Sequence, residues 1–431
     1  MQLLEQLSRI WDGIDYPFLI HNGQELRFSD VASQHPVDIS SVHAGDVVAI
    51  IGDFDPASIL TLLRLIDLGV IVVPLTVETA HEHAYFFEAA LVDVVIQGNQ
   101  VQRLVHTQTH DFINALRKEA HAGLVLFSTG TTGRPKAILH DLSLFLKRFE
   151  TPRPALRTLS FLLFDHIGGI NTLMHTLFNK GVVVAPEFRT VDSVLDTCRR
   201  YDVEVLPTTP TFLRLMLMSG SVPEAVPSCL KVVTYGTERM DQPTLDALCE
   251  LLPDVDFRQT FGMSELGIVR VKSAARNSLF MQVGGEGVET RVVNDVLQIR
   301  SQSRMLGYLN APSPFDADGW YDTKDVVEIK DGCYKVTGRI SDVINVGGLK
   351  FMASEVERVA LSFPDVALVK VIPRDNPITG QHVELLAQPT SEKGIDAYKL
   401  MNFLKERLQS HMVPKRIRVE KVSVGHRFKR Q

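Results

Sequence analysis

Residues 128–136 read Ser-Thr-Gly-Thr-Thr-Gly-Arg-Pro-Lys and follow an apolar run at 124–127 that predicts a buried strand. Gly130 and Gly133 let the backbone turn tightly and bring its N–H groups close to a ligand. Hydroxyls and positive charges after a strand favour a phosphate site. Here they belong to Ser128, Thr129, Thr131, Thr132, Arg134 and Lys136. A Walker A loop has Lys and Ser/Thr directly after its last glycine, whereas here Arg134, Pro135 and Lys136 follow Gly133, so the stretch predicts a phosphate loop of another kind.

Length and composition narrow the class of protein. The chain has 431 residues, 45% hydrophobic and 22% charged, which indicates a globular protein with two or more domains. A net charge of -6 gives no overall attraction to nucleic acid or to anionic membranes. The four cysteines form no zinc pattern, and no apolar run approaches the roughly 20 residues of a membrane span. The first residues lack the features of a signal peptide, so we expect a cytoplasmic protein.

Apolar runs and helical patterns alternate along most of the chain, which predicts parallel α/β units. Helices are expected at 56–68, 140–149 and 191–201, and strands at 70–75, 94–96, 182–186 and 231–234. Residues 280–335 are rich in strand and turn signals and indicate a small barrel-like subdomain. The expected fold class is therefore α/β, with stacked βα sheets in a large N-terminal domain.

A second motif lies at 259–265, which reads Gln-Thr-Phe-Gly-Met-Ser-Glu. Together with 128–136 it resembles the signatures of the adenylate-forming superfamily, which includes acyl- and aryl-CoA synthetases, peptide synthetase adenylation domains and firefly luciferase. The resemblance implies that Phe261 stacks on adenine and that Ser264 meets phosphate. Glu265 would hold a catalytic Mg²⁺, which prefers hard oxygen ligands. Gly262 and Met263 would border the substrate pocket.

Two further segments resemble the nucleotide-binding parts of this superfamily. Residues 235–238, Tyr-Gly-Thr-Glu, match the turn that lines the adenine and acyl pockets, which assigns Tyr235, Gly236 and Thr237 to the site. Tyr235 replaces a small residue and is expected to crowd the pocket. Asp325 would accept hydrogen bonds from the ribose hydroxyls, although Lys324 replaces the usual glycine before it. Arg339 would contact the ribose.

Residues 164–169, Phe-Asp-His-Ile-Gly-Gly, resemble the segment that borders the acyl pocket in acyl- and aryl-CoA synthetases. The resemblance places His166 and Gly169 at the substrate pocket. In peptide synthetase domains an aspartate near here holds the substrate amine, so Asp165 leaves an amino-acid substrate open. We expect a non-amino acid of modest size.

The last part of the chain resembles the small, mobile α+β domain of the superfamily. The pattern at 338–350 makes Asp342 the hinge and Gly347 and Gly348 part of the thiol tunnel, which divides the chain into domains at 1–341 and 342–431. Counting from Ser423 puts Lys429 at the position of the catalytic lysine. Phe428 replaces the preceding glycine, and Arg427 and Arg430 are the rival candidates.

The resemblance implies an ATP-dependent acid–thiol ligase that forms an acyl-AMP, releases pyrophosphate and transfers the acyl group to a thiol. The substrate would be a fatty or aryl acid, and the expected cofactors are ATP, Mg²⁺ and a thiol from CoA or from a carrier protein's phosphopantetheine. Three alternatives stay open: an amino-acid-activating enzyme, an adenylate-only enzyme, and an inactive nucleotide-binding or scaffold homologue. The acid, the acceptor and the oligomeric state are not determined by the sequence.

Overall fold

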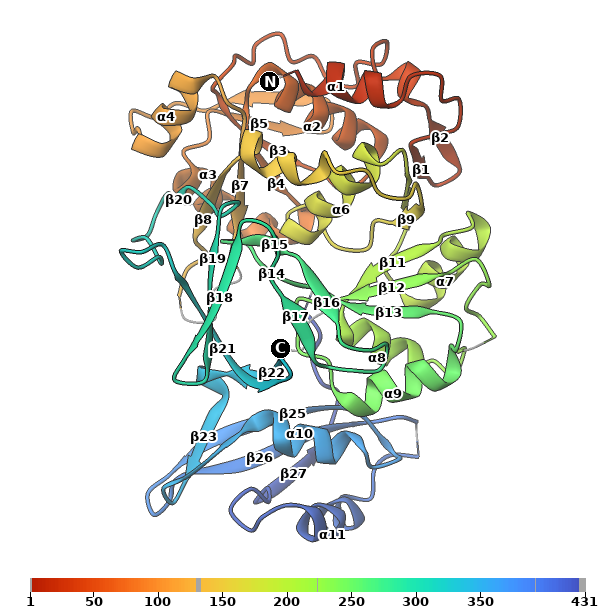
Figure 1. Cartoon of the computed structure of the whole chain (residues 1–431), viewed down its shortest axis with the longest axis vertical. Helices are drawn as coiled ribbons and strands as arrows, with labels where there is room; N and C mark the ends of the chain where they lie inside the picture. Colours follow the sequence, from red (N-terminus) through yellow and green to blue (C-terminus); the bar gives the residue numbers. More distant parts are fainter. Residues whose placement is uncertain (1, 129–132, 223, 392, 426–431) are drawn as a thin grey trace.

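Two mostly parallel sheets of seven strands form the larger part of the molecule (Figure 1). The structure is a computed structural model that describes residues 2–128, 133–222, 224–391 and 393–425. The first sheet has the order β20 (Gly307–Tyr308), β8 (Ala137–Asp141), β7 (Gly123–Phe127), β4 (Ile71–Leu75), β3 (Val47–Ile51), β5 (Val94–Gln97) and β6 (Gln100–Arg103). The second has the order β13 (Asp256–Gln259), β12 (Val232–Tyr235), β11 (Val205–Thr208), β9 (Arg157–Leu159), β10 (Val182–Ala185), β1 (Leu19–His21) and β2 (Gln24–Leu26).

Helices cover both faces of each sheet, and the expected α/β class with stacked sheets is confirmed. Between the sheets, and sharing one core with both, lie α1 (Leu3–Ile10), α2 (Pro56–Leu68), α5 (Leu142–Leu146) and α6 (Ile167–Phe178). On the outer faces lie α3 (His83–Ala90) and α4 (Asp111–Glu119), and α7 (Val191–Arg200), α8 (Pro210–Met218) and α9 (Gln242–Leu251). None of the described helices has the length and apolar character that a membrane crossing requires.

The local sequence explains most of these elements. Helix α2 begins where the side chain of Asp55 accepts a hydrogen bond from the N–H of Ser58, with Pro56 in the first turn. It ends at Gly69, whose φ of 84° is the left-handed conformation that glycine adopts readily. The helix expected at 56–68 is therefore confirmed to the residue.

The helix expected at 140–149 is wrong in its first part. Residues 137–141 form β8, which pairs antiparallel with β7, and the helix α5 starts only at Leu142. The side chain of Asp141 accepts from the N–H of Ser143 at 2.8 Å and so marks the helix start. Residues 137–140 are all buried, and a short apolar run buried on both faces has no period that separates strand from helix.

An antiparallel sheet follows the two large sheets and corresponds to the expected barrel-like subdomain. Its order is open, from β16 (Val271–Ser273) through β17 (Met281–Val283), β22 (Cys333–Arg339), β21 (Tyr321–Lys330) and β19 (Val296–Ser301) to β18 (Val288–Val293). A two-stranded ribbon, β14 (Phe261–Met263) and β15 (Gly267–Val269), shares its core. The described strands therefore form a half-barrel.

The C-terminal part has a separate hydrophobic core and lies at the lower end of the molecule in Figure 1. It consists of β23 (Val343–Val346), β24 (Leu349–Met352), α10 (Ala353–Leu361), β25 (Val366–Asn376), β26 (Gly380–Pro389), α11 (Ala397–Arg407) and β27 (Arg416–Val419). The expected boundary at residue 342 falls at the end of the short 3-10 turn η4 (Ile340–Asp342). That boundary stays a prediction.

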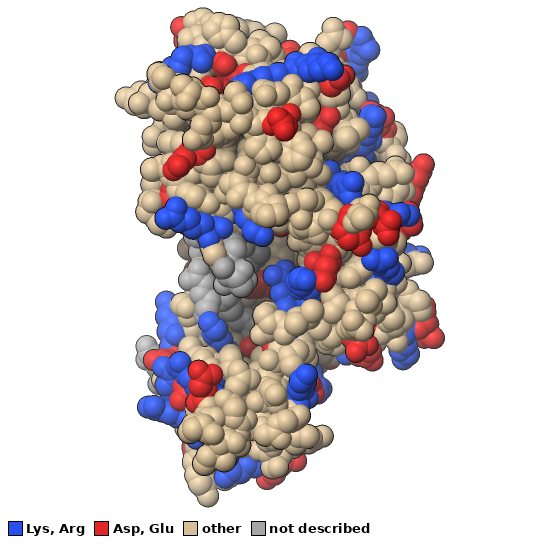
Figure 2. Space-filling model, turned by 90° about the vertical axis from the view of Figure 1, so that its left-hand side faces the viewer, with Lys and Arg blue, Asp and Glu red and all other residues tan. Residues whose placement is uncertain are grey.

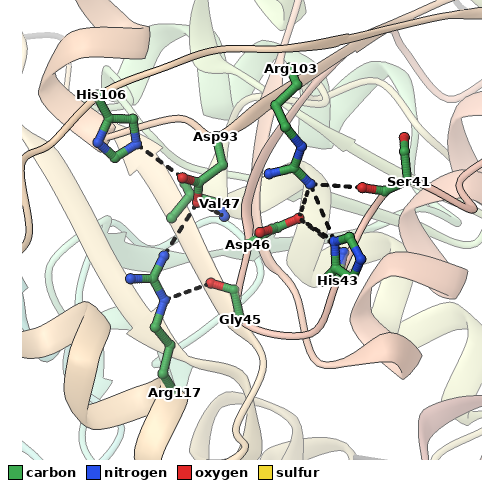
Figure 3. A network of polar contacts seen from close by, with 9 residues as sticks. All are labelled: Ser41, His43, Gly45, Asp46, Val47, Asp93, Arg103, His106 and Arg117. Carbon is green, nitrogen blue, oxygen red and sulfur yellow. Dashed lines mark hydrogen bonds and ion pairs between the residues drawn. The ribbon is translucent and has the colours of Figure 1, made fainter.

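A polar network joins the amino ends of β3 and β5 to β6 and α4 (Figure 3). The carboxylate of Asp93 accepts from the N–H of Val47 at 2.8 Å and from Arg117 at 3.3 Å, and it lies 3.0 Å from His106. Open α/β sheets bind ligands at the carboxyl ends of their strands. The network therefore braces the edge of the first sheet that faces away from a ligand site.

Candidate active site

The two ends of the phosphate-loop stretch are held together where β7 and β8 meet. The N–H of Ser128 donates to the carbonyl of Lys136, and the N–H of Lys136 donates to Oγ of Ser128, both at 3.0 Å. Gly133 is exposed between them. Four predicted phosphate-binding residues lie outside the described residues and stay predictions: Thr129, Gly130, Thr131 and Thr132.

The C-terminal end of the loop is fixed by contacts from distant parts of the chain. The N–H of Ala137 donates to Oδ1 of Asn310 at 2.9 Å, and the hydroxyl of Tyr85 donates to the carbonyl of Pro135 at 2.8 Å. The exposed Lys136 places its Nζ 4.8 Å from the ring centre of Tyr308, which is a cation–π contact. Its positive charge therefore lies beside Tyr308.

Glu265 is oriented by a tyrosine. The hydroxyl of Tyr308 donates to Oε1 of Glu265 at 2.8 Å. Burial raises the pKa of Tyr308 and of the nearby Tyr321, and the charge of Glu265 raises both further. Both hydroxyls therefore stay protonated, and that of Tyr308 holds the carboxylate in place as a donor.

The segment that carries Ser264 is anchored by a buried histidine. Nε2 of His140 donates to the carbonyl of Ser264 at 2.6 Å, which fixes the turn just before Glu265. Burial lowers the pKa of His140 to about 4, so the ring is neutral at pH 7. His140 is therefore a positioning residue for the carboxylate.

Asp325 and Arg339 form an ion pair at the predicted ribose position. Nε of Arg339 lies 3.2 Å from Oδ1 of Asp325, whose residue is only 6% exposed. Burial raises the pKa of Asp325 to about 6, against the opposing charge of Arg339. Lys324 has a φ of 62° and so takes the left-handed conformation of the glycine it replaces. The Asp322 side chain, which accepts from the N–H of Lys324 at 2.9 Å, supports that turn.

Beside these groups, a cavity of about 280 Å³ lies between α6 and the strands β9, β11 and β12. Gly236, Thr237 and Thr260 are among the residues that line this cavity. A Cβ on Gly236 would lie 2.1 Å from Oγ1 of Thr260, so only glycine fits. Thr237 has a φ of 69°, which completes the sharp turn after β12.

The side chain of Tyr235 does not crowd this cavity, contrary to the expectation from the sequence. Tyr235 is 1% exposed and packs in the core beneath α8 and α9. Side chains alternate between the two faces of a strand, so Val232, Thr234 and Gly236 face the cavity while Tyr235 faces away. Its predicted contact with adenine is not supported by this orientation.

The motif at 259–265 folds as the two-stranded ribbon β14–β15. Phe261 is 9% exposed, because its ring packs in the core of the half-barrel rather than standing open for a base to stack on it. Gly262 is closely packed, since a Cβ there would lie 2.9 Å from the carbonyl of Gly267. Met263 is half-buried against the same core. The predicted substrate contacts of Gly262 and Met263 stay predictions.

His166 and Gly169 build the start of α6. Nδ1 of His166 accepts a hydrogen bond from the N–H of Gly168 at 3.0 Å and so caps the helix. A Cβ on Gly169 would lie 2.1 Å from the carbonyl of Leu163, which explains the glycine by packing. Gly168, and not Gly169, is among the residues that line the cavity.

The remaining predicted residues lie in the C-terminal part or beyond the described chain. Asp342 accepts from the N–H of Arg339 at 3.1 Å and thereby shapes the turn that enters this part. Gly347 and Gly348 form the exposed turn between β23 and β24, and added Cβ atoms there would meet nothing within 4 Å. The structure does not bring this turn to the site. Lys429 and its rivals Arg427 and Arg430 lie outside the described residues.

The site therefore contains residues that the sequence motifs did not identify as functional. Tyr308, Tyr321 and His140 come from β20, β21 and β8. Tyr308 and His140 act on the motif at 259–265 through hydrogen bonds, and the buried hydroxyl of Tyr321 feels the charge of Glu265. Such contacts depend on which distant strands lie side by side, so the spacing of residues in the sequence does not predict them. In the sequence, Tyr308 and Tyr321 lie in a segment rich in strand and turn signals, and this position was the only indication of their role.

The described residues fit a magnesium ion that is held mainly by a nucleotide. No group of three or more His, Cys, Asp or Glu side chains among the described residues is placed to hold a metal. Mg²⁺ in nucleotide enzymes commonly takes one or two carboxylates together with phosphates and water. Glu265, with one oxygen held by Tyr308, is a hard oxygen donor of this kind.

Comparisons with known proteins agree with this arrangement. The family model described as AMP-binding enzyme matches residues 39–309. Among curated relatives, 4-coumarate–CoA ligase 4 of Arabidopsis thaliana is 25% identical over 276 residues, which are 56% of this chain and 48% of that protein. The acyl-CoA ligase ppsA of Aspergillus oryzae is 26% identical over 288 residues, 58% of this chain and 50% of its own length. The chain thus spans about half the length of the curated relatives it matches.

Solved structures share the fold over almost the whole chain. The anthranilate CoA ligase AuaEII in complex with anthranoyl-AMP has a TM-score of 0.83 and 18% identity, covering 100% of this chain and 95% of that one. The o-succinylbenzoate CoA synthetase MenE of Bacillus subtilis, in complex with the acyl-adenylate OSB-AMP, has a TM-score of 0.75 and 20% identity, covering 100% and 96%. Since the family model covers more than half of its residues, this chain belongs to the AMP-binding enzyme family.

Proposed function

We propose that the protein is an ATP-dependent acid–thiol ligase. It activates a non-amino carboxylic acid as an acyl-adenylate with release of pyrophosphate, and then transfers the acyl group to a thiol of CoA or of a carrier protein. The observation that carries the proposal is a chain of contacts from Lys136 through Tyr308 to Glu265, with the charges of Glu265 and Asp325 both acting on the hydroxyl of Tyr321. Thr260 and Ile268, which lie on either side of Glu265 in the sequence, line the cavity beside α6.

The first half-reaction needs positioning rather than a strong base. A carboxylate is a weak nucleophile, so the protein contributes by aligning it with the α-phosphorus and by neutralising charge. Lys136 would neutralise phosphate oxygens from the rim of the loop, and the carboxylate of Asp325 would accept from the ribose hydroxyls. An oxygen of the substrate carboxylate attacks the α-phosphorus and forms the new O–P bond. The bond between the α-phosphorus and the oxygen that bridges it to the β-phosphorus breaks, and pyrophosphate leaves with that electron pair.

Glu265 would hold Mg²⁺, which when bound offsets negative charge on the phosphate oxygens. The hydroxyl of Tyr308 keeps the carboxylate oriented, and His140 keeps the preceding backbone in place. Lys429, outside the described residues, is proposed to bridge the substrate carboxylate and the α-phosphate. These roles extend the predictions made from the sequence motifs.

The second half-reaction would use a different face of the C-terminal part. A thiolate attacks the acyl carbon of the adenylate, the thioester bond forms, and AMP leaves with the electron pair of the broken C–O bond. We propose that rotation about Asp342 withdraws Lys429 and brings the Gly347–Gly348 turn toward the thiol. Figure 2 shows Lys and Arg side chains on the larger part and on the C-terminal part where the two face each other, which suits polyanionic substrates.

The lining of the cavity argues against an amino acid as substrate. Among its described lining residues there is no Asp or Glu that would hold an ammonium group. Asp165 is 4% exposed and is not part of this lining. The proposed substrate is therefore a carboxylic acid without a charged amine.

The test is product analysis with ATP, Mg²⁺ and a panel of fatty, aryl, hydroxy and amino acids, with and without CoA. We expect AMP, pyrophosphate and an acyl thioester from one class of acid. Glu265→Gln should lower kcat by about 100-fold, the order of a lost charge-stabilising group. Glu328→Gln, on the exposed surface of β21, is the matched control and should retain activity. Formation of ADP and phosphate, or full activity of Glu265→Gln, would contradict the proposal.

A further inference from the structure

The cavity beside α6 has a polar wall along the helix. One face of α6 carries Gly168, Asn171, Thr172, His175, Thr176 and Asn179, all of which line the cavity. The spacing of three and four residues puts them on a single stripe. The opposite face packs in the hydrophobic core through Ile170, Leu173, Met174 and Leu177. The helix therefore presents polar groups to a space that apolar side chains would otherwise fill.

Part of this stripe is satisfied within the protein. The hydroxyls of Thr172 and Thr176 donate at 2.8 Å to carbonyls one turn earlier, on Gly168 and Thr172. Asn179 donates to the carbonyl of His175 at 2.7 Å and accepts from the N–H of Arg153. These side chains complete the helix and need no ligand.

His175 and Asn171 are different, because neither side chain has a hydrogen-bond partner among the described residues. The ring of His175 makes an edge contact with Phe149 at 6.4 Å and is otherwise exposed within the open cavity. On the facing strand, Oγ1 of Thr208 is buried without a partner, and the residue is 1% exposed. Buried polar groups in proteins are almost always paired, so the free hydroxyl of Thr208 points to a ligand in this cavity, to which His175 and Asn171 also offer polar groups.

The charge of the cavity is close to zero. Burial lowers the pKa of His175, and the nearby charge of Arg153 lowers it further, so the imidazole is neutral and offers one donor and one acceptor. Arg258 also lines the cavity, but its guanidinium pairs with Asp256 at 2.7 Å. A second carboxylate or an ammonium group on the substrate would find no counter-charge here.

The position of His175 fixes where the recognised group lies. Gly236 and Thr260 line the cavity where the second sheet's strands end, and Thr260 lies five residues before Glu265, so the proposed function places the carboxylate of the acid at this end. Gly168 lies at this end of α6, and His175 is seven residues further along the helix, a rise of about 10 Å. His175 therefore faces the part of the substrate that is most distant from its carboxylate.

We propose that His175 is a specificity-determining residue, which hydrogen-bonds to a neutral hydroxyl or carbonyl group at the distal end of a ring-sized carboxylic acid. The cavity of about 280 Å³ lies at the small end of ligand sites, which suits one ring and not a long fatty chain. Asn171, one turn before His175 on α6, belongs to the same polar wall, and Thr208, which pairs with Tyr235, lies at the Gly236 end of the cavity. The proposal rests on the proposed acid–thiol ligase function.

The experiment compares 4-hydroxybenzoate, benzoate and hexanoate as substrates for acid-dependent AMP release by the full chain. We expect the wild-type protein to prefer 4-hydroxybenzoate. His175→Leu should lower kcat/KM for this acid by roughly 10- to 100-fold and leave benzoate within about threefold, since a lost hydrogen bond to a substrate hydroxyl costs this much. His175→Gln, which keeps a donor and an acceptor, should recover part of the loss. Thr197→Val is the control, because that hydroxyl bonds to a carbonyl within its own helix, α7, and the residue does not line the cavity.

A preference for hexanoate, or an equal loss for benzoate and 4-hydroxybenzoate in His175→Leu, would overturn the proposal. Calorimetric titration of the same acids into both proteins without ATP provides the second readout. If no acid supports AMP release, the ligase function fails, but weaker binding of 4-hydroxybenzoate to His175→Leu would still uphold the role of His175. Equal affinity of 4-hydroxybenzoate for the wild-type protein and for His175→Leu would overturn the proposed role of His175.

Discussion

Asp325 links the protonation of a single residue to nucleotide binding. Burial raises its pKa to about 6, above the 3.8 of an ordinary aspartate. Folding therefore favours the protonated form: the stabilising contribution is complete below pH 3.8 and is lost as the pH rises through about 6. Binding of ribose has the opposite sign, because the ionised carboxylate is the better acceptor.

We therefore expect the affinity for ATP to fall by about tenfold between pH 7 and pH 5, as Asp325 takes up a proton. Asp325→Asn should bind ATP more weakly at pH 7 and show little change over this range. Fluorescence or calorimetric titration of both proteins from pH 5 to pH 8 measures this. The same slope in wild type and Asp325→Asn would show that another group is responsible.

Gly236 tests the packing of the turn after β12. A Cβ there would lie 2.1 Å from Oγ1 of Thr260 and 2.9 Å from its carbonyl, so Gly236→Ala must displace backbone. We expect a loss of about 2 kcal/mol in the free energy of unfolding, typical of overpacking, and a loss of activity. Gly133→Ala is the control for stability, because a Cβ at Gly133 meets nothing within 4 Å. Urea unfolding of the two variants should separate them, and equal stability would refute the packing argument.

At the scale of elements, the network in Figure 3 should determine how firmly the first sheet is held at its amino edge. Asp93→Ala removes the acceptor for Val47, Arg117 and His106 together. We expect the free energy of unfolding to fall by about 2 kcal/mol, since a buried N–H and a guanidinium lose their partner. Asp12→Ala, at an exposed position, should change it by less than about 0.5 kcal/mol. The urea midpoints of both variants measure this difference. Similar midpoints would show that the network does not stabilise the fold.

Several elements follow from local patterns and others do not. Helix α2 could be bounded from sequence because Asp55, Pro56 and Gly69 mark its ends. Strand β8 could not, because residues 137–140 are buried on both sides and carry no alternation. The orientation of Tyr235 was also misjudged, since the face of a strand depends on register within the sheet. Where a cap or a turn fixes an end, sequence suffices, and where tertiary pairing decides, it does not.

At the scale of the whole molecule, Arg214 ties the larger part to the C-terminal part. From α8, its guanidinium donates to the carbonyls of Val366 and Ala367, each at 2.8 Å. The ion pair of Arg239 and Glu357, at 3.5 Å, lies at the same contact. These contacts hold the C-terminal part in the orientation seen in Figure 1.

Arg214→Ala should loosen this contact without unfolding either part. We expect faster hydrogen exchange in β25 and α10 and an altered ratio of adenylation to thioester formation, because the two proposed half-reactions need different orientations. Arg200→Ala, whose cation–π contact with Tyr201 stays within the second sheet's helices, is the control. Exchange rates and reaction ratios unchanged from wild type would show that Arg214 does not hold the two parts together.

The motifs predicted the family and the order of the site along the chain, because short stretches such as 128–136 carry that information in their residues. The contact of Tyr308 with Glu265, and the polar stripe of α6 facing β11, arise only when distant strands and helices meet. For the same reason the sequence suggested a pocket narrowed by Tyr235, whereas the cavity is lined by Thr234 and Gly236. The chemistry of a site can thus be read from motifs more readily than the shape of its pocket.

The most direct test of the central claim is acid-dependent exchange of labelled pyrophosphate into ATP. This exchange reports the adenylation step alone and needs no thiol. We predict exchange with one class of neutral ring-sized acids, lost in Lys429→Ala and strongly reduced in Glu265→Gln. Exchange absent with every acid while ATP still binds would contradict adenylate formation, and undiminished exchange in Glu265→Gln would contradict the site described around Tyr308 and Tyr321.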